Sequence, residues 1–111
     1  MNVEELKHEL KKIFGEQVVF NKEFDDLAKV IKNIDTNLIS WCLELKDNKI
    51  VPAKPPLLPG HFVFVKKIGS SNRCIIIKIT NGVFTEIHLG DHKYYDLLRQ
   101  KLGLKENSRM Y

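Results

Sequence analysis

The stretch Arg73-Cys74-Ile75-Ile76-Ile77-Lys78-Ile79-Thr80-Asn81-Gly82-Val83-Phe84-Thr85-Glu86-Ile87-His88-Leu89 decides the fold of this 111-residue chain. Two runs rich in β-branched residues flank Asn81-Gly82. This dipeptide between such runs indicates a two-residue β-hairpin turn, because both of its positions tolerate positive φ. A third apolar run, Phe62–Ile68, lies just upstream, beyond Gly69-Ser70-Ser71-Asn72. The sequence therefore predicts three consecutive antiparallel strands.

Two amphipathic helices are predicted before these strands. Apolar residues recur at helical spacing from Val3 to Ile13, and Gly15 is a natural stop. Val18-Val19-Phe20 is a short apolar link, after which Asn21 suits an N-cap. Phe24–Ile34 then continues the helical pattern, so the two helices should form an antiparallel hairpin whose apolar faces need a partner layer.

The remaining segments complete an α+β domain. Leu38–Lys46 alternates apolar and polar residues, which is typical of a half-buried strand. Residues 52–60 are predicted as an extended loop, because prolines remove backbone donors. Tyr94–Leu104 reads as a closing helix. The predicted fold is one domain over residues 1–111: a helical hairpin (1–36) packed on a four-stranded antiparallel sheet with its proline loop (37–90), and a C-terminal helix (91–105).

Composition and charge narrow the function. The chain is 43% hydrophobic and 29% charged, as in ordinary globular proteins, and has neither a membrane-spanning run nor a signal peptide, so we expect a cytoplasmic protein without membrane contact. Cys42 and Cys74 fit buried thiols, and no Cys/His spacing suggests zinc. Residues 1–60 hold 9 basic and 10 acidic side chains (net −1), whereas residues 61–111 hold 9 and 4 (net +5). The basic half indicates an anionic partner, with nucleic acid first.

The hairpin register groups polar side chains on one face of the predicted sheet. Counting back from the turn pairs Ile79 with Phe84, Ile77 with Glu86, Ile75 with His88, and Arg73 with Gly90. Side chains alternate along a strand, so Arg73, Glu86 and His88 share a face with Ile75, Ile77, Ile79 and Phe84. The opposite, core face holds Cys74, Ile76, Val83, Ile87 and Leu89, and Lys78 and Thr85 interrupt it toward the turn.

Lys66 joins this polar face if Ile68 pairs with Arg73, and a slip of one residue would bring Lys67 there instead. His92 and Tyr95 follow the last strand and could overhang its end. Such a cluster suits phosphodiester cleavage: lysine and arginine neutralise the scissile phosphate, and histidine transfers protons near neutral pH.

With RNA the 2′-hydroxyl can be the nucleophile, so the expected chemistry needs no metal and no cofactor. The candidate catalytic residues are Lys66, Arg73, His88, His92 and Tyr95, and the candidate RNA-binding residues are Lys67, Lys78, Glu86, Lys93 and Arg99.

Structural roles remain open for several of these residues. Arg73 and Glu86 also fit a cross-sheet ion pair, and His88 in an apolar strand also fits a hydrogen-bonded structural histidine. Asp91 and His92 also fit a helix-capping pair, with Asp91 as the N-cap.

The order of elements and two local motifs resemble the RelE/ParE superfamily of toxins from type II toxin–antitoxin modules. Asn72-Arg73-Cys74-Ile75-Ile76 is similar to the arginine at the start of a central strand in that family. Residues 87–96, Ile-His-Leu-Gly-Asp-His-Lys-Tyr-Tyr-Asp, resemble the closing strand of the HigB-like branch, with His92, Tyr95 and Asp96 at its Gly-x-His and Tyr-Asp positions.

The resemblance implies a RelE/ParE-like fold and a metal-independent endoribonuclease (mRNA interferase) that cleaves mRNA on the ribosome, with Lys66, Arg73 and His92 carrying the cleavage and an antitoxin protein covering the basic face. The alternative is a non-enzymatic module that binds nucleic acid or protein through the same face. A third interpretation, a metal-dependent nuclease, rests on Glu44-Leu45-Lys46 at the end of a predicted strand, with Asp35 upstream.

Overall fold

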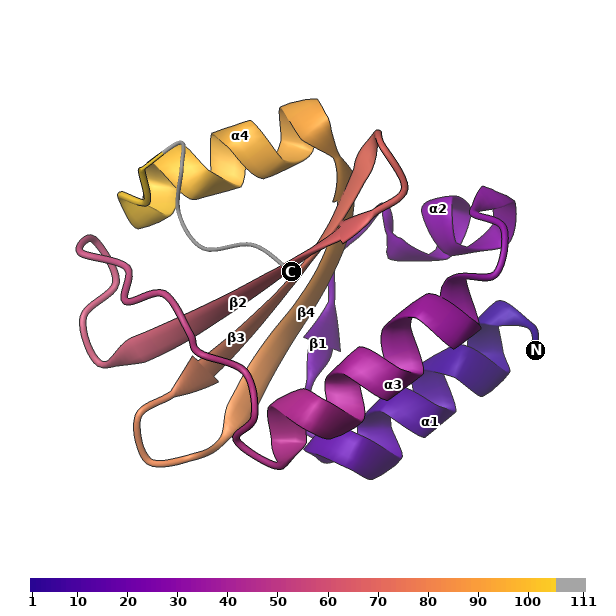
Figure 1. Ribbon diagram of the computed structural model, residues 1–111, viewed down its shortest axis with the longest axis horizontal. Helices are drawn as coiled ribbons and strands as arrows, with labels where there is room; N and C mark the ends of the chain where they lie inside the picture. The colour runs from indigo at the N-terminus through magenta and orange to yellow at the C-terminus, as the bar shows by residue number, and fades with distance from the viewer. Residues whose placement is uncertain (106–111) are drawn as a thin grey trace.

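The computed structural model describes residues 1–105, which form four helices and a four-stranded sheet (Figure 1). In chain order the elements are α1 (Val3–Phe14), β1 (Val19–Phe20), α2 (Phe24–Val30), α3 (Ile34–Lys46), β2 (His61–Ile68), β3 (Asn72–Ile79), β4 (Phe84–Asp91) and α4 (His92–Leu102). The α+β class, the first helix, the three-strand meander and the closing helix are confirmed.

The sheet is mixed, so the prediction of an antiparallel sheet is wrong. Its order is β1-β4-β3-β2, and β1 runs parallel to β4. The apolar link at residues 18–20 supplies this short strand. Asn21 holds it in place rather than capping a helix: its side chain accepts from the Leu89 N–H (2.8 Å) and donates to the Leu89 carbonyl (2.9 Å).

The predicted strand Leu38–Lys46 is instead most of helix α3. Its buried residues are Ile34, Leu38, Trp41, Cys42 and Leu45, a spacing of three and four that belongs to a helix. The alternation that suggested a strand also included Leu43, which is 50% exposed. The predicted helix Phe24–Ile34 is too long, because α2 ends at Val30. Asn33 turns the chain with a φ of 57°, and Ile34 begins α3.

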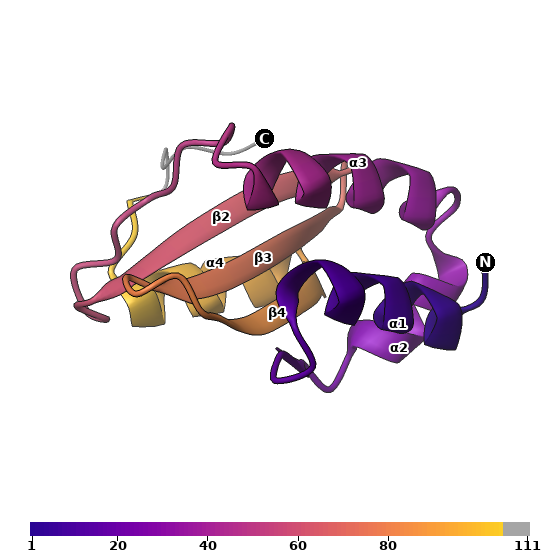
Figure 2. The ribbon, with the colours of Figure 1, turned by 90° about the horizontal axis from the view of Figure 1, so that it is seen from below.

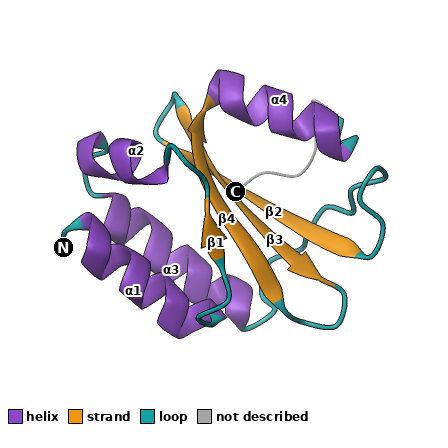
Figure 3. Cartoon of the chain, turned by 180° about the vertical axis from the view of Figure 1, so that it is seen from behind, coloured by secondary structure: helices purple, strands orange, loops and turns teal. Residues whose placement is uncertain are grey.

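Helices cover both faces of the sheet (Figures 2 and 3). Helices α1 and α3 lie side by side on one face, here called the helical face, and α4 lies on the other, here called the α4 face. The core of the helical face joins the buried residues of α1, α2 and α3 to Phe64, Ile68, Cys74, Ile76, Phe84, Ile87 and Leu89. The smaller core of the α4 face joins Tyr95, Leu102 and Leu104 to Val63, Val65, Ile75 and Ile77.

The β3–β4 hairpin differs from prediction at its turn. Gly82 N–H donates to the Ile79 carbonyl and Ile79 N–H to the Val83 carbonyl, so the loop has three residues, with positive φ only at Gly82. Lys78 therefore pairs with Phe84, which puts Phe84 in the core of the helical face. A bulge then shifts the register back, so that the predicted pairs from Ile77–Glu86 to Arg73–Gly90 are confirmed.

Two further features of the structure concern the cysteines and the lengths of the helices. Cys42 and Cys74 are free and fully buried, as expected. None of the helices within residues 1–105 has the length and apolar character needed to cross a lipid bilayer.

Candidate functional site

A row of side chains crosses the α4 face at the end of the sheet where β2 and β4 finish and β3 begins. Lys67 of β2 pairs with Arg73 of β3, and Arg73 pairs with Gly90 of β4. Asp91 follows Gly90 at once and is the N-cap of α4, since its side chain accepts from the Tyr94 N–H. The capping role considered for Asp91 is confirmed. The first turn of α4 therefore starts beside this row.

Lys66 is not part of the row, which corrects its predicted position. Ile68 pairs with Asn72 rather than Arg73, so Lys66 lies opposite Cys74 on the helical face. Its charge acts on the Cys42 and Cys74 thiols of that core, opposing the burial that raises the pKa of Cys74 to about 12. Lys67, the next residue of β2, occupies the position beside Arg73 that was predicted for Lys66.

Arg73 and Tyr95 form the centre of the candidate site. Arg73 is buried, with 6% of its surface exposed, and donates one bond, from Nη1 to the Asn72 carbonyl at 2.9 Å. Its Nε has no hydrogen-bond partner among the described residues, and neither has the buried hydroxyl of Tyr95. No described carboxylate lies within ion-pair distance of Arg73, so the cross-sheet pair with Glu86 is not formed.

The positive charges around Tyr95 are close enough to affect its ionisation. Burial raises the pKa of the Tyr95 phenol, whereas the charges of Arg99 and Arg73 act in the opposite direction. A buried guanidinium and a buried hydroxyl with unused hydrogen-bonding capacity are uncommon, because buried polar groups normally find partners. Arg73 and Tyr95 each keep a polar atom whose hydrogen-bonding capacity no described residue uses.

A second cluster of polar side chains lies on β4, two to four residues before Gly90. His88 is held from both sides: its Nδ1 lies 2.7 Å from the Tyr94 hydroxyl, and its Nε2 lies 2.9 Å from Glu86 Oε1. The bond to His88 is the main cause that lowers the pKa of Glu86. Burial raises the pKa of Tyr94, and the charge of Glu23 adds to this effect. The carboxylate, imidazole and phenol thus form a continuous chain of proton-transferring groups.

Gly90 allows Tyr94 to reach His88. A Cβ at position 90 would lie 2.2 Å from Cδ1 of Tyr94 and 2.7 Å from its Cβ, so only glycine leaves room for the ring against the strand. Tyr94 was not among the predicted site residues. A glycine four residues before a tyrosine, with a histidine two residues before that glycine, is the signal that could have found it.

The other predicted residues are dispersed. His92 is exposed and pairs with Asp96 at 3.2 Å, and Asp96 also pairs with Arg99 at 3.4 Å. Arg99 in addition donates to the Leu104 carbonyl, two residues beyond the end of α4. Lys93 is exposed on the first turn of α4. Lys78 lies on the helical face, where its ammonium is 5.3–5.9 Å from the rings of Phe62, Phe64 and Phe84, so it does not join the row at Arg73.

The metal-nuclease interpretation loses its structural basis, since Glu44 and Lys46 lie on helix α3 and not on a strand. Within residues 1–105 no group of three His, Cys, Asp or Glu side chains is placed to hold a metal ion.

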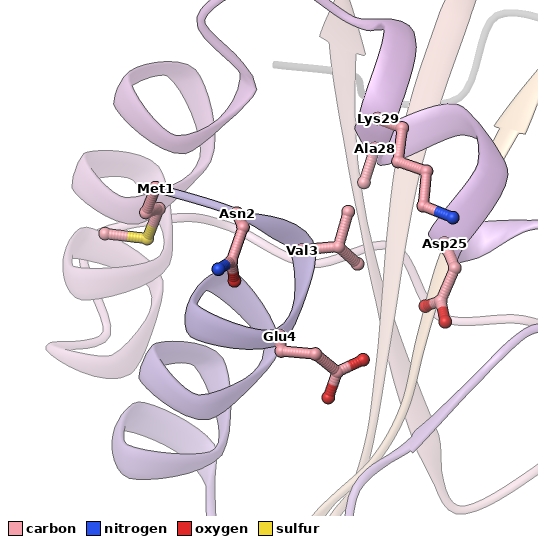
Figure 4. Close-up of a pocket in the computed structure, with 7 residues that line it drawn as sticks. All are labelled: Met1, Asn2, Val3, Glu4, Asp25, Ala28 and Lys29. Carbon is pink, nitrogen blue, oxygen red and sulfur yellow. The ribbon is translucent and has the colours of Figure 1, made fainter.

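A pocket of about 500 Å³ lies between α1 and α2 (Figure 4), where Glu4 and Asp25 extend toward one another. None of the candidate residues lines it.

Comparison with known proteins adds no assignment: no family model, no curated protein and no solved structure matches this chain. The function therefore has to be argued from the geometry of the α4 face and from the motifs that it contains.

Proposed function

We propose that this protein is a RelE/ParE-like endoribonuclease that cleaves RNA with its own side chains and needs no metal. The observation that supports it is that Arg73 is a buried guanidinium without an acidic partner, whose charge acts on the pKa of the Tyr95 hydroxyl, and that this hydroxyl makes no hydrogen bond to a described residue. Lys67 replaces Lys66 as the lysine of the site, because it pairs directly with Arg73.

The cationic row would bind the phosphate at which cleavage occurs. In metal-free RNA cleavage the 2′-oxygen attacks the neighbouring phosphorus and the bond to the 5′-oxygen of the next nucleotide breaks. One proton leaves the 2′-hydroxyl and one is delivered to the departing oxygen, which gives a 2′,3′-cyclic phosphate and a 5′-hydroxyl. Negative charge grows on the phosphate oxygens during the attack, and Lys67, Arg73 and the Tyr95 hydroxyl would stabilise it.

The chain Glu86–His88–Tyr94 would supply the departing oxygen with its proton. The raised pKa of Tyr94 keeps the phenol protonated at neutral pH, so it can donate, and His88 can pass a proton to it through their 2.7 Å bond. His92 is the candidate for the opposite transfer, because Asp96 holds its Nδ1 and leaves Nε2 without a partner among the described residues.

The resemblance to RelE/ParE toxins extends this proposal to its setting. It implies ribosome-bound mRNA as the substrate, an antitoxin protein as the partner that neutralises the activity, and the cytoplasm as the compartment. The aromatic rings and cations of the α4 face are the kinds of groups that RNA-binding surfaces use for bases and phosphates.

One observation favours the alternative, a module that binds nucleic acid or protein without cleaving it. Only 6% of Arg73 is exposed, so little of the guanidinium is open to a ligand. In that case Arg73 and Tyr95 would strengthen binding without contacting a reacting phosphate.

The test is cleavage of mRNA in a translating extract, with and without EDTA, scored by a cyclic phosphate at the new 3′ end. Tyr95→Phe is the sharpest variant: the lost hydroxyl makes no hydrogen bond, so the free energy of unfolding should stay within about 0.5 kcal/mol. Removal of one transition-state donor should lower the rate about 100-fold or more.

Lys67→Ala and Lys66→Ala provide a matched pair, since these neighbours lie on opposite faces of β2. Cleavage should fall in the first variant and persist in the second. Binding of RNA without any cleavage would support the non-enzymatic module, and cleavage that stops in EDTA would contradict the metal-free chemistry.

A further inference from the structure

A second pocket, of about 370 Å³, lies between the turn that joins α2 to α3 and the turn that joins β2 to β3. Residues 30–32 and 37 line one side of this pocket, here called the turn pocket, and residues 68–72 line the other. Its volume is in the range of about 300–1,000 Å³ that is typical of small-molecule sites. A Cβ added at Gly69 would meet no atom within 4 Å, so the space beside the β2–β3 turn is open.

The turn pocket combines apolar surface with polar side chains that have few partners. Ile68 is 2% exposed and belongs to the core of the helical face, whereas Val30 is 76% exposed, so the pocket presents apolar surface to a ligand. Within residues 1–105 the polar side chains of the pocket make no hydrogen bond or ion pair, apart from a 3.5 Å contact between two serine hydroxyls. These polar residues are Lys32, Asn37, Ser70, Ser71 and Asn72.

Apolar surface beside free amide groups suits a nucleobase, which has flat faces for packing and a polar edge for hydrogen bonds. A side-chain carboxamide pairs with N6–H and N7 of adenine, and lysine pairs with O6 and N7 of guanine. The pocket offers both kinds of group, in Asn37, Asn72 and Lys32. Both pairings use N7, which pyrimidines lack, so the chemistry of the pocket favours a purine.

The turn pocket adjoins the candidate site. Asn72 lines the pocket, and its carbonyl accepts the hydrogen bond from Nη1 of Arg73 at 2.9 Å. A strand that placed a phosphate at Arg73 would therefore bring a neighbouring base to the pocket.

We propose that the turn pocket binds one purine base of a single-stranded RNA whose adjacent phosphate lies at Arg73. RNA as the ligand rests on the proposed function, and the purine adds a preference at one position of the strand. Asn37 and Asn72 would read the edge of the base, and Val30 would pack against its face.

The test uses hexamers of 2′-O-methyl RNA, which cannot be cleaved through the 2′-oxygen. Hexauridylate is compared with the same strand carrying adenine, guanine or an abasic residue at one inner position. Kd is measured at constant salt by the fluorescence anisotropy of a 5′-fluorescein label. The purine strands should bind about tenfold more tightly than the uridine and abasic strands, which is the discrimination of one bidentate pair. The side-chain amide signals of Asn37 and Asn72 in NMR spectra should shift with the purine strands only.

Variants of single carboxamides assign the preference to the pocket. Asn37→Ala removes an exposed side chain that makes no hydrogen bond, so the protein should stay folded and the purine preference should fall below about threefold. Asn72→Ala should have the same effect, and neither variant should change the affinity for hexauridylate. Gln100→Ala is the matched control, because it removes an exposed carboxamide of α4 that does not line the pocket; it should keep the full preference.

Equal affinity for the purine, uridine and abasic strands would overturn the proposal, and so would a purine preference that Asn37→Ala and Asn72→Ala leave unchanged. If the abasic strand binds as tightly as the purine strands and shifts the same amides, the pocket holds a phosphate and not a base. These measurements are independent of catalysis. Purine-selective binding by a protein that cleaves no RNA would support the pocket and contradict the proposed function, whereas cleavage without any base preference in binding would do the reverse.

Discussion

Gly90→Ala is the substitution whose effect can be worked out most fully from the structure. The new methyl group would lie 2.2 Å from the Tyr94 ring and 2.7 Å from its Cβ, and the Cβ cannot move away without moving the helix backbone. Steric overpacking of this kind costs about 1–3 kcal/mol. The displaced ring also loses its bond to His88, which adds about 1 kcal/mol.

The expected loss is therefore about 3 kcal/mol, equivalent to a fall in Tm of about 12 °C for a domain of this size. Urea unfolding can be followed by the fluorescence of Trp41, the single tryptophan, which is buried in the core of the helical face. The midpoint should fall while the slope of the free energy against urea stays the same, because the variant changes stability and not the area exposed on unfolding.

A double-mutant cycle with Tyr94→Ala assigns the cost to this contact. Once the ring is gone, Gly90→Ala should be neutral or slightly stabilising, because alanine restricts the unfolded chain more than glycine does. The coupling energy should be about 2 kcal/mol or more. If Gly90→Ala costs the same with and without the ring, Tyr94 does not pack against the strand as described, and the reasoning on the proton-transferring chain falls with it.

Three other predictions follow from single contacts. Asn21→Ala should cost about 2 kcal/mol in urea unfolding, because it removes both bonds to the backbone of Leu89 and leaves those groups without partners; an unchanged midpoint would contradict the role of this side chain in holding β1. The folded-state pKa of Glu86 is lowered, so its contribution to stability is present above the unfolded pKa and is lost as the pH falls through the folded value. In the Glu86→Gln variant, Tm should therefore fall less steeply below about pH 4.5 than in the wild type. The same decrease of Tm with pH in both proteins would contradict this prediction. The Cys42 and Cys74 thiols, with their raised pKa values and full burial, should react with a thiol reagent only through unfolding, so rapid labelling of the native protein would disprove their packing.

Strands β2, β3 and β4 and helix α1 could be predicted because their sequence signals were local and unambiguous. Val3, Leu6, Leu10 and Ile13 repeat at helical spacing and at no other, and Leu6 and Leu10 are buried as expected. Arg73 to Leu89 carries two β-branched runs and a turn dipeptide. Its register was confirmed from Ile77–Glu86 to Arg73–Gly90, because the bulge after Ile77 restores the pairing, whereas the predicted pair of Ile79 with Phe84 is wrong.

Helix α3 could not be identified because its apolar residues satisfy two periods at once. Ile39, Trp41, Leu43 and Leu45 alternate, yet Leu38, Trp41, Cys42 and Leu45 also fit a helix. Tertiary packing favours the helix over the strand. Helix α3 lies beside α1 over the sheet, and this arrangement buries Leu38 and Cys42 completely and leaves Leu43 half exposed. The same reasoning explains β1, because two residues are too short for a pattern and become a strand only beside β4.

The position of the lysine in the candidate site depended on a single residue of register. Val63, Phe64 and Val65 are all apolar, so β2 is apolar on both of its faces. The hydrophobic pattern therefore does not predict which face each residue occupies. Lys66 was predicted for this position, with Lys67 as the alternative, and the structure has Lys67 there.

The length of the β2–β3 turn fixes that register, and the cores on both faces hold it. Ile68 pairs with Asn72 across three residues, which places Phe64 and Ile68 under α1 and α3 and Val65 under α4. In the predicted register, with Ile68 opposite Arg73, Lys66 would lie opposite Ile75, in the place that the buried Val65 takes in the core of the α4 face. Burial of an unpaired ammonium is costly, so β2 is confined to the register that sets Lys67 beside Arg73. The alternation that builds the two cores therefore also determines which lysine can bind an anion at the end of the sheet.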